Sequence, residues 1–142
     1  MSTTVEETLV LVKPDGVARS LTGEVLRRIE AKGYLLVDIR MLQADRDLLA
    51  AHYAEHEGKP FYEPLVEFME SGPVVAMRVA GNSVIEGFRA LMGATDPTKA
   101  APGTIRGDLA RDWGLKVQQN LVHGSDSPES AARELALWFP VR

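Results

Sequence analysis

The chain has 142 residues, the length of one domain, and its 45% hydrophobic and 25% charged residues are close to the average of globular proteins. It contains no cysteine, which excludes disulfides and thiolate chemistry, and no apolar run approaches the roughly 20 residues that span a membrane. The net charge of −4 favours a small anion in a pocket over a nucleic acid on a surface. The N-terminus is acidic and unlike a secretion signal, so we expect a cytoplasmic protein.

The first part of the chain alternates strand-like and helical segments. An apolar, β-rich run at Glu7–Val12 predicts a buried strand, and the KPDG motif at 13–16 predicts a turn after it. Apolar residues at helical spacing predict a helix over Leu21–Lys32, which Gly33 ends. Residues Tyr34–Leu42 are again typical of a strand.

Two helices are predicted next. Asp45 is a suitable N-cap for a helix to about His56, and a shorter helix is expected over Pro60–Glu70. His52 and His56 lie four residues apart, as in zinc proteases, but those enzymes need Glu where this chain has Tyr53. We therefore expect both histidines on a solvated face of the helix.

The second half of the chain contains a stretch at 93–107 that is rich in Gly, Pro and Thr and long for a connecting loop. Long loops in compact domains tend to be functional. Around this stretch the pattern predicts a strand at Val74–Val79, a helix capped by Asn82 and ending near Met92, a strand at Lys116–Val122, and a helix opened by Ser127 and Pro128 and ending near Trp138.

Four strands with helices between them predict a single α/β (α+β) domain over 1–142. The two helical segments between the second and third strands favour a ferredoxin-like, four-stranded sheet packed with helices. Periodicity leaves antiparallel and mixed pairing both open.

The best candidate for a reactive residue is His123, between the fourth strand and the last helix. The chain has neither a P-loop nor a dinucleotide-binding glycine motif, so any phosphates must be held by side chains. A neutral imidazole can attack phosphorus, although a turn histidine that only bonds its neighbours is the simpler interpretation. Glu134 lies on the apolar stripe of the last helix and either bonds the histidine ring or reaches water at the edge of the stripe.

Cationic residues could hold phosphate near this histidine. Arg89 and Arg106 flank the long loop together with Thr95, and Lys13 follows the first strand. One guanidinium group can bind two phosphate oxygens at once. Each of these cations taken alone, however, could simply be a surface residue. Phe61 could stack on a base, although packing is the better interpretation from its neighbours alone.

Four motifs resemble those of the nucleoside diphosphate kinase family and occur in the family's order. The resemblance covers about Glu7 to Phe139 and implies phosphate transfer from a nucleoside triphosphate to a nucleoside diphosphate, with little preference among bases. A nucleotide-binding module without turnover remains the alternative. The motifs are KPDG at 13–16, SGPVVA at 71–76, PGTIRGD at 102–108 and NLVHGSD at 120–126.

The resemblance also implies roles for individual residues. His123 matches the phosphorylated nucleophile, Glu134 the glutamate that orients it, and Tyr53 a tyrosine beside it. It implies Mg²⁺ carried on the nucleotide, with Asp126 close to the ion. The nucleotide contacts implied are Arg89, Thr95 and Arg106 to phosphates, Lys13 and Asn120 near the sugar hydroxyls and phosphate, and Phe61 and Val117 on opposite faces of the base.

The resemblance further implies a homo-oligomer, either a tetramer or a hexamer, with no membrane and no specific nucleic acid as partners. One departure from the family pattern is clear. The stretch between Asp108 and Asn120 is several residues longer than usual, around residues 109–112. We expect the extra residues to bulge from the surface and to leave the site intact.

Overall fold

A four-stranded antiparallel sheet forms the centre of the protein. The computed structural model describes residues 5–115, 117 and 119–140. Strand β1 (Val5–Val12) lies between β3 (Val74–Asn82) and β4 (Val122–Gly124), and β2 (Leu35–Leu42) pairs with the other side of β3. Every pairing is antiparallel, which settles the point that the sequence leaves open.

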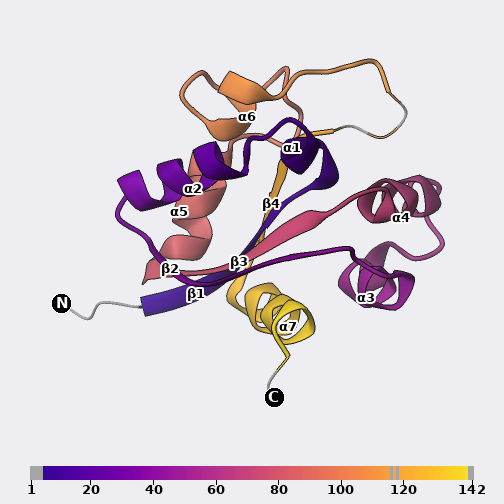
Figure 1. Cartoon of the computed structure of the whole chain (residues 1–142), viewed down its shortest axis with the longest axis horizontal. Coiled ribbons are helices and arrows are strands. Elements are labelled where there is room, and N and C mark those ends of the chain that lie inside the picture. The colour runs from indigo at the N-terminus through magenta and orange to yellow at the C-terminus, as the bar shows by residue number, and fades with distance from the viewer. Residues whose placement is uncertain (1–4, 116, 118, 141–142) are drawn as a thin grey trace.

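Helices cover both faces of the sheet and confirm the predicted ferredoxin-like α+β class (Figure 1). Helices α2 (Thr22–Ala31) and α5 (Val84–Met92) lie on one face, and α7 (Pro128–Trp138) lies on the other beside α3 (Arg46–His52) and α4 (Tyr62–Glu70). No described helix is long and apolar enough to cross a membrane. Two short helices, α1 (Pro14–Ala18) and α6 (Ile105–Leu109), complete the α-helices of the described residues.

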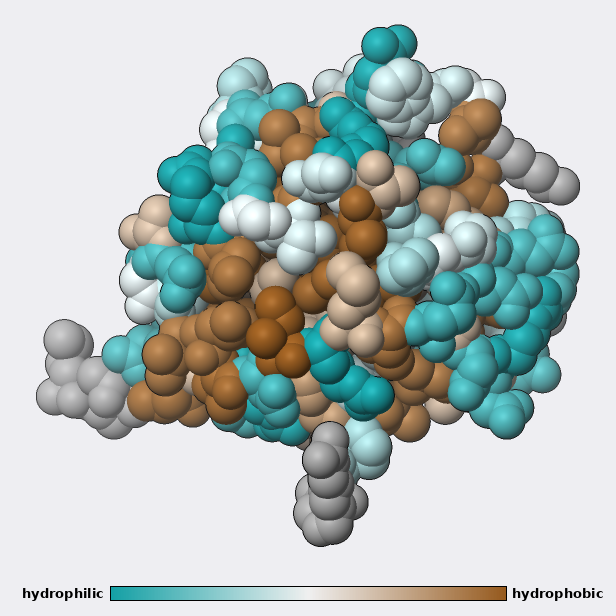
Figure 2. Space-filling model, in the orientation of Figure 1, coloured by the Kyte–Doolittle hydropathy of each residue, from teal (hydrophilic) through white to brown (hydrophobic). Residues whose placement is uncertain are grey.

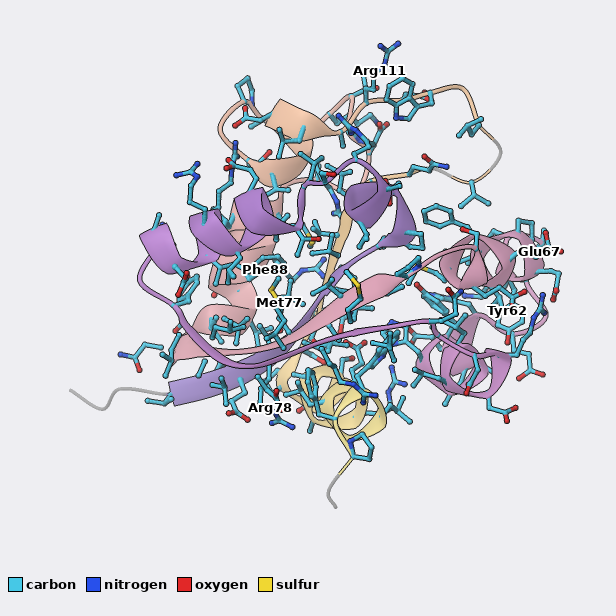
Figure 3. All side chains as sticks on the ribbon, in the orientation of Figure 1. Tyr62, Glu67, Met77, Arg78, Phe88 and Arg111 are labelled. Atoms are coloured by element: carbon cyan, nitrogen blue, oxygen red, sulfur yellow. The ribbon has the colours of Figure 1, made fainter. Side chains whose placement is uncertain are left out.

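Alternation along β1 divides the core into two layers. Val10 faces the layer that contains Met77 and Phe88, between the sheet and α2 and α5 (Figure 3). Leu11, one residue on, faces the layer that contains Trp138 of α7. Successive strand residues point to opposite faces, so a strand buried on both faces shows a continuous apolar run.

Two predicted boundaries on the second half of the chain are wrong. Asn82 does not cap α5, because β3 continues to Asn82 and Ser83, with a φ of 54°, precedes the helix without a side-chain cap. The strand predicted at Lys116–Val122 is found at Val122–Gly124. Leu121 has a φ of 72°, which no extended strand can contain, so β4 begins after it. Lys116 and Gln118 lie outside the described residues.

Local capping explains where the other helices begin. The Asp45 carboxylate accepts a hydrogen bond from the Leu48 N–H and starts α3, as predicted, and Ser127 does the same for α7. Helix α3 ends at His52, earlier than expected, and a 3-10 turn continues to His56. The turn predicted after β1 is the short helix α1, and α6 begins inside the long loop at 93–107.

Candidate active site

His123 lies within β4, opposite Leu11 of β1, and therefore faces the layer of α7. Its Nε2 is 2.8 Å from Oε1 of Glu134 on that helix. The Ser125 hydroxyl donates to the same carboxylate oxygen over 2.7 Å and accepts from the Leu9 N–H. Of the two interpretations of Glu134, the structure therefore supports the bond to His123.

These hydrogen bonds keep Glu134 charged and fix which ring nitrogen of His123 carries the hydrogen. Burial opposes the charge of Glu134, but hydrogen bonding to the His123 ring, with a smaller contribution from Ser125, holds the pKa of the carboxyl below its usual value. A charged carboxylate accepts a hydrogen bond and cannot donate one, so the hydrogen of the neutral imidazole lies on Nε2. The lone pair is then on Nδ1, the nitrogen available for attack.

His52 is buried against this pair, so the expectation of a solvated face is wrong for it. Its side chain is 4% exposed, its ring centroid is 4.8 Å from that of His123, and its Nδ1 accepts a hydrogen bond from Trp138 Nε1. Burial lowers the pKa of His52 to about 3, so the ring is neutral. Its partner Trp138 lies 86 residues away in the chain, which the helical spacing around His52 could not reveal.

Three side chains at this point are of types that bind metals. Ligand atoms of His52, His123 and Glu134 lie within 4.8 Å of one another. However, the Glu134 oxygen and the His123 nitrogen bond each other, and Trp138 occupies one nitrogen of His52. The geometry therefore serves a hydrogen-bonded histidine better than a resident metal.

Lys13 and Arg106 bring positive charge close to His123. Lys13 Nζ donates to Asn120 Oδ1 over 2.9 Å, and burial, together with the charge of Arg106, lowers the pKa of Lys13 to about 8. The buried Arg106 guanidinium donates to the carbonyls of Gly93, Asn120 and Val122. Burial, together with Arg89, lowers the pKa of Arg106 to about 10, so it stays charged at neutral pH.

A cavity of about 220 Å³ joins the polar groups around His123. Asn120 spans it, because its amide nitrogen donates to the Thr95 carbonyl while its oxygen accepts from Lys13. Arg89, whose guanidinium lies 3.4 Å from the Gly124 carbonyl oxygen, is at the wall. The predicted residues that line this cavity are Lys13, Tyr53, Arg89, Thr95, Arg106, Asn120, His123, Asp126 and Glu134.

A second cavity, of about 600 Å³, contains the remaining predicted residues and shares Lys13, Tyr53, Thr95, Asn120 and His123 with the first. Phe61 is 48% exposed at its wall and its ring contacts that of His56 edge-on, so it packs at the edge of this cavity and is not a core residue. Val117 and Leu65 also line it. The candidate site therefore has a polar part beside His123 and an apolar part beyond it.

The structure adds residues that the motifs did not single out. Ser125 bonds Glu134, and Asp15 accepts from the backbone of Leu121. Both lie inside motifs that the sequence analysis quotes, but only the pairing of distant segments shows what they contact. Of the extra residues near 109–112, Leu109 is the last residue of α6. The residues at 111–115, which follow, are exposed.

Comparison with known proteins identifies the family of this chain. A model of the nucleoside diphosphate kinase family matches residues 6–142. The nucleoside diphosphate kinase of Mycolicibacterium gilvum is 61% identical over 95% of this chain and 97% of its own, and that of Rubrobacter xylanophilus is 61% identical over 94% and 98%. The structure of a halophilic enzyme of this name from Halobacterium salinarum, in complex with CDP, has a TM-score of 0.90 and 48% identity, covering 97% of this chain and 90% of that one. The chain belongs to the nucleoside diphosphate kinase family.

Proposed function

We propose that this enzyme works in two half-reactions through a phosphohistidine at His123; the transfer of phosphate between nucleotides itself follows from the family. In the first, Nδ1 attacks the terminal phosphorus of a nucleoside triphosphate, an N–P bond forms, and the bond to the diphosphate oxygen breaks. In the second, the terminal oxygen of another nucleoside diphosphate takes the phosphate from Nδ1. The observation that carries the proposal is the 2.8 Å bond from Nε2 to Glu134, which leaves Nδ1 with its lone pair.

The polar cavity supports this chemistry because phosphoryl transfer depends on positioning and charge neutralisation. We assign phosphate binding to Arg89, Thr95 and Arg106, and contacts with the sugar hydroxyls and phosphate to Lys13 and Asn120. With a pKa of about 8, Lys13 is mostly protonated at neutral pH and gains further positive charge as a phosphate approaches. Tyr53 keeps its phenolic proton, since burial raises its pKa.

Magnesium enters with the nucleotide in this proposal. Asp126 lines the cavity, and hydrogen bonds from Ser130 and Ser127 help to keep its pKa below the usual value, so it is a charged oxygen donor of the kind Mg²⁺ prefers. The ion would neutralise charge on the phosphates, and Asp126 would hold it at this side of the cavity.

The apolar cavity supports binding of the base. We assign one face of the base to Phe61 and the other to Val117, both of which line this cavity. Every base has a π-face, so stacking discriminates weakly, and we expect several bases to be accepted. The Halobacterium salinarum structure contains CDP, and we extend nucleoside diphosphate binding of that kind to this chain.

Labelling with ATP whose terminal phosphate is radioactive tests the function. Without acceptor, the wild-type protein should take label that survives alkali and is lost in mild acid, as a phosphorylated imidazole does, and GDP should remove it. His123→Ala should take no label yet still bind ADP, while the control Asp47→Ala, at an exposed position of α3, should label normally. Wild-type protein that binds nucleotide but never takes label would instead support a binding module without turnover.

A further inference from the structure

A carboxylate near the start of α1, that of Asp15, has no task in the proposed reaction. Its side chain is 9% exposed, and its Oδ2 accepts a 3.1 Å hydrogen bond from the backbone N–H of Leu121. Burial raises the pKa of Asp15, while the charge of Lys13 and the bond from Leu121 oppose the rise. Burying a carboxylate costs stability unless it is paired or hydrogen-bonded, so a contact must keep Asp15 in this position.

The partner of this carboxylate is in a strained conformation. Leu121 has a φ of 72°, a left-handed conformation that costs a residue with a side chain about 1–2 kcal/mol. Two bonds from one short segment hold it: Asp15 accepts from its N–H, and the Lys13 N–H donates to its carbonyl over 2.8 Å. The segments are so close that a Cβ on Gly16 would lie 3.1 Å from that carbonyl oxygen.

The neighbours of Leu121 carry the site. Asn120, one residue before, accepts from Lys13 Nζ and donates to the Thr95 carbonyl. Val122, one residue after, begins β4, the strand that carries the nucleophile. The left-handed residue therefore sets the direction in which the Asn120 side chain enters the cavity.

We propose that Asp15 is a positioning residue for nucleotide binding. Its carboxylate holds Leu121 in the left-handed conformation, so that Asn120 joins Lys13 to Thr95 across the cavity. This rests on the proposed function, in which these three residues contact the nucleotide.

The nucleophile should be far less sensitive to this turn. Glu134 lies on α7 and is held by Ser125, which in turn bonds Leu9 of β1, so the support of His123 does not pass through Asp15. Loss of the Asp15 bond should therefore weaken nucleotide binding more than it weakens the reactivity of the imidazole.

Two phosphate donors separate these effects. ATP needs contacts with its sugar, its base and three phosphates, whereas phosphoramidate is a small donor with a single phosphoryl group and no nucleoside. Its P–N bond breaks, a new P–N bond to the imidazole forms and ammonia leaves. For Asp15→Ala we expect the KM for ATP to rise about tenfold or more, because one buried hydrogen bond is lost. We expect the rate of labelling by phosphoramidate to stay within about threefold of wild type. Asp15→Asn, whose amide oxygen can still accept from Leu121, should return the KM to within about threefold. Asp47→Ala, at an exposed position of α3, is the matched control and should behave as wild type.

Several outcomes would overturn the proposal. One is an unchanged KM for ATP in Asp15→Ala, and another is an equal loss of labelling from both donors, which would make Asp15 a support of the whole fold. A third is Asp15→Asn being as impaired as Asp15→Ala, because charge rather than the acceptor oxygen would then matter. If Asp15→Ala does not fold, Asp15→Ser, whose hydroxyl is too short to reach Leu121, replaces it with the same expectations. Wild-type protein that takes no label from either donor would contradict the proposed function itself.

Discussion

The Glu134 carboxylate does two things for the His123 ring. It fixes the hydrogen on Nε2, and in the proposed reaction it would place a negative charge beside an imidazole that becomes more positive as its other nitrogen bonds phosphorus. Ser125 restrains the same carboxylate oxygen, so the carboxylate cannot easily turn away to bind water. The pair therefore combines orientation with electrostatic stabilisation at one contact.

Replacing this carboxylate by an amide should slow phosphorylation while leaving nucleotide binding nearly intact. In Glu134→Gln we expect a rate about tenfold lower or more, since one such hydrogen bond contributes about 1–3 kcal/mol. Single-turnover labelling by ATP measures the rate, and ADP titration measures binding. Glu129→Gln, at an exposed position of the same helix, is the control. Phosphorylation of Glu134→Gln at the wild-type rate would limit Glu134 to a structural role.

His52 should make the protein sensitive to acid. Its pKa is about 3 in the folded protein and about 6.5 when unfolded, so below pH 6.5 the unfolded chain binds a proton that the native state does not. The free energy of unfolding should then fall by up to about 1.4 kcal/mol per pH unit from this residue, as pH decreases from 6.5 toward 3.

His52→Gln tests this pH dependence, because its amide oxygen can accept from Trp138 but does not titrate. Urea unfolding at pH 7, 6 and 5 should show a shallower loss of stability in the variant than in wild type. Measurements above pH 5 exclude most of the effect of Glu134 on the pH dependence. Its lowered pKa means that this carboxylate loses its charge, and the stability that the charge provides, only at more acidic pH. Parallel slopes in wild type and His52→Gln would refute the assignment.

At the scale of elements, the sequence predicts what local chemistry decides. Asp45 and Ser127 cap their helices by bonds that span only three residues, so both helix starts could be predicted. The start of β4 could not, because bonds to Lys13 and Asp15, more than 100 residues away, hold Leu121 outside the strand. The same limit explains why a motif indicated His123 and the apolar stripe of the last helix indicated Glu134, whereas the buried position of His52 emerged only from the packing of α3 against α7.

The lengthened segment after α6 is a surface feature with its own contacts. Trp113 is exposed, and the guanidinium of Arg111 lies 4.4 Å from its ring centroid. Arg111 projects from the edge of the molecule (Figure 3). Arg19 also approaches this indole and donates to the Leu109 carbonyl at the base of the segment. These contacts are exposed, so their contribution to stability is small, about 0.5–1 kcal/mol each.

Removing residues 111–114 should therefore change stability more than turnover. We expect a modest drop in melting temperature and a turnover within about tenfold of wild type, because no residue of 111–114 lines either cavity. Trp113→Ala, measured in parallel, separates the loss of the indole from the loss of chain length. A folded deletion variant whose turnover falls more than about a hundredfold would mean that the segment positions Val117 or Asn120.

At the scale of the whole molecule, the apolar surface is unevenly distributed. Four of the eight large apolar side chains that are exposed among the described residues belong to β2: Leu35, Val37, Ile39 and Met41, at 43% to 65% exposure. Figure 2 shows hydrophobic residues gathered over this part of the sheet, interrupted by hydrophilic side chains. Strand β2 is also an edge of the sheet, so its outer backbone groups are not paired within the sheet. An apolar edge strand of this kind favours pairing with another chain.

We expect this edge to join copies of the chain. The family resemblance predicts a homo-oligomer, so the partner that covers β2 would be a second copy of this chain. Sedimentation equilibrium should give a mass that is a multiple of 15.5 kDa for wild type. Ile39→Lys combined with Met41→Lys should shift the equilibrium toward smaller species, because two charges buried in an apolar contact cost several kcal/mol. Leu115→Lys places a charge at an equally exposed apolar residue outside β2 and should leave the mass unchanged. A wild-type monomer would contradict the oligomer, and dissociation by Leu115→Lys alone would show that the contact is formed by the segment after α6 instead.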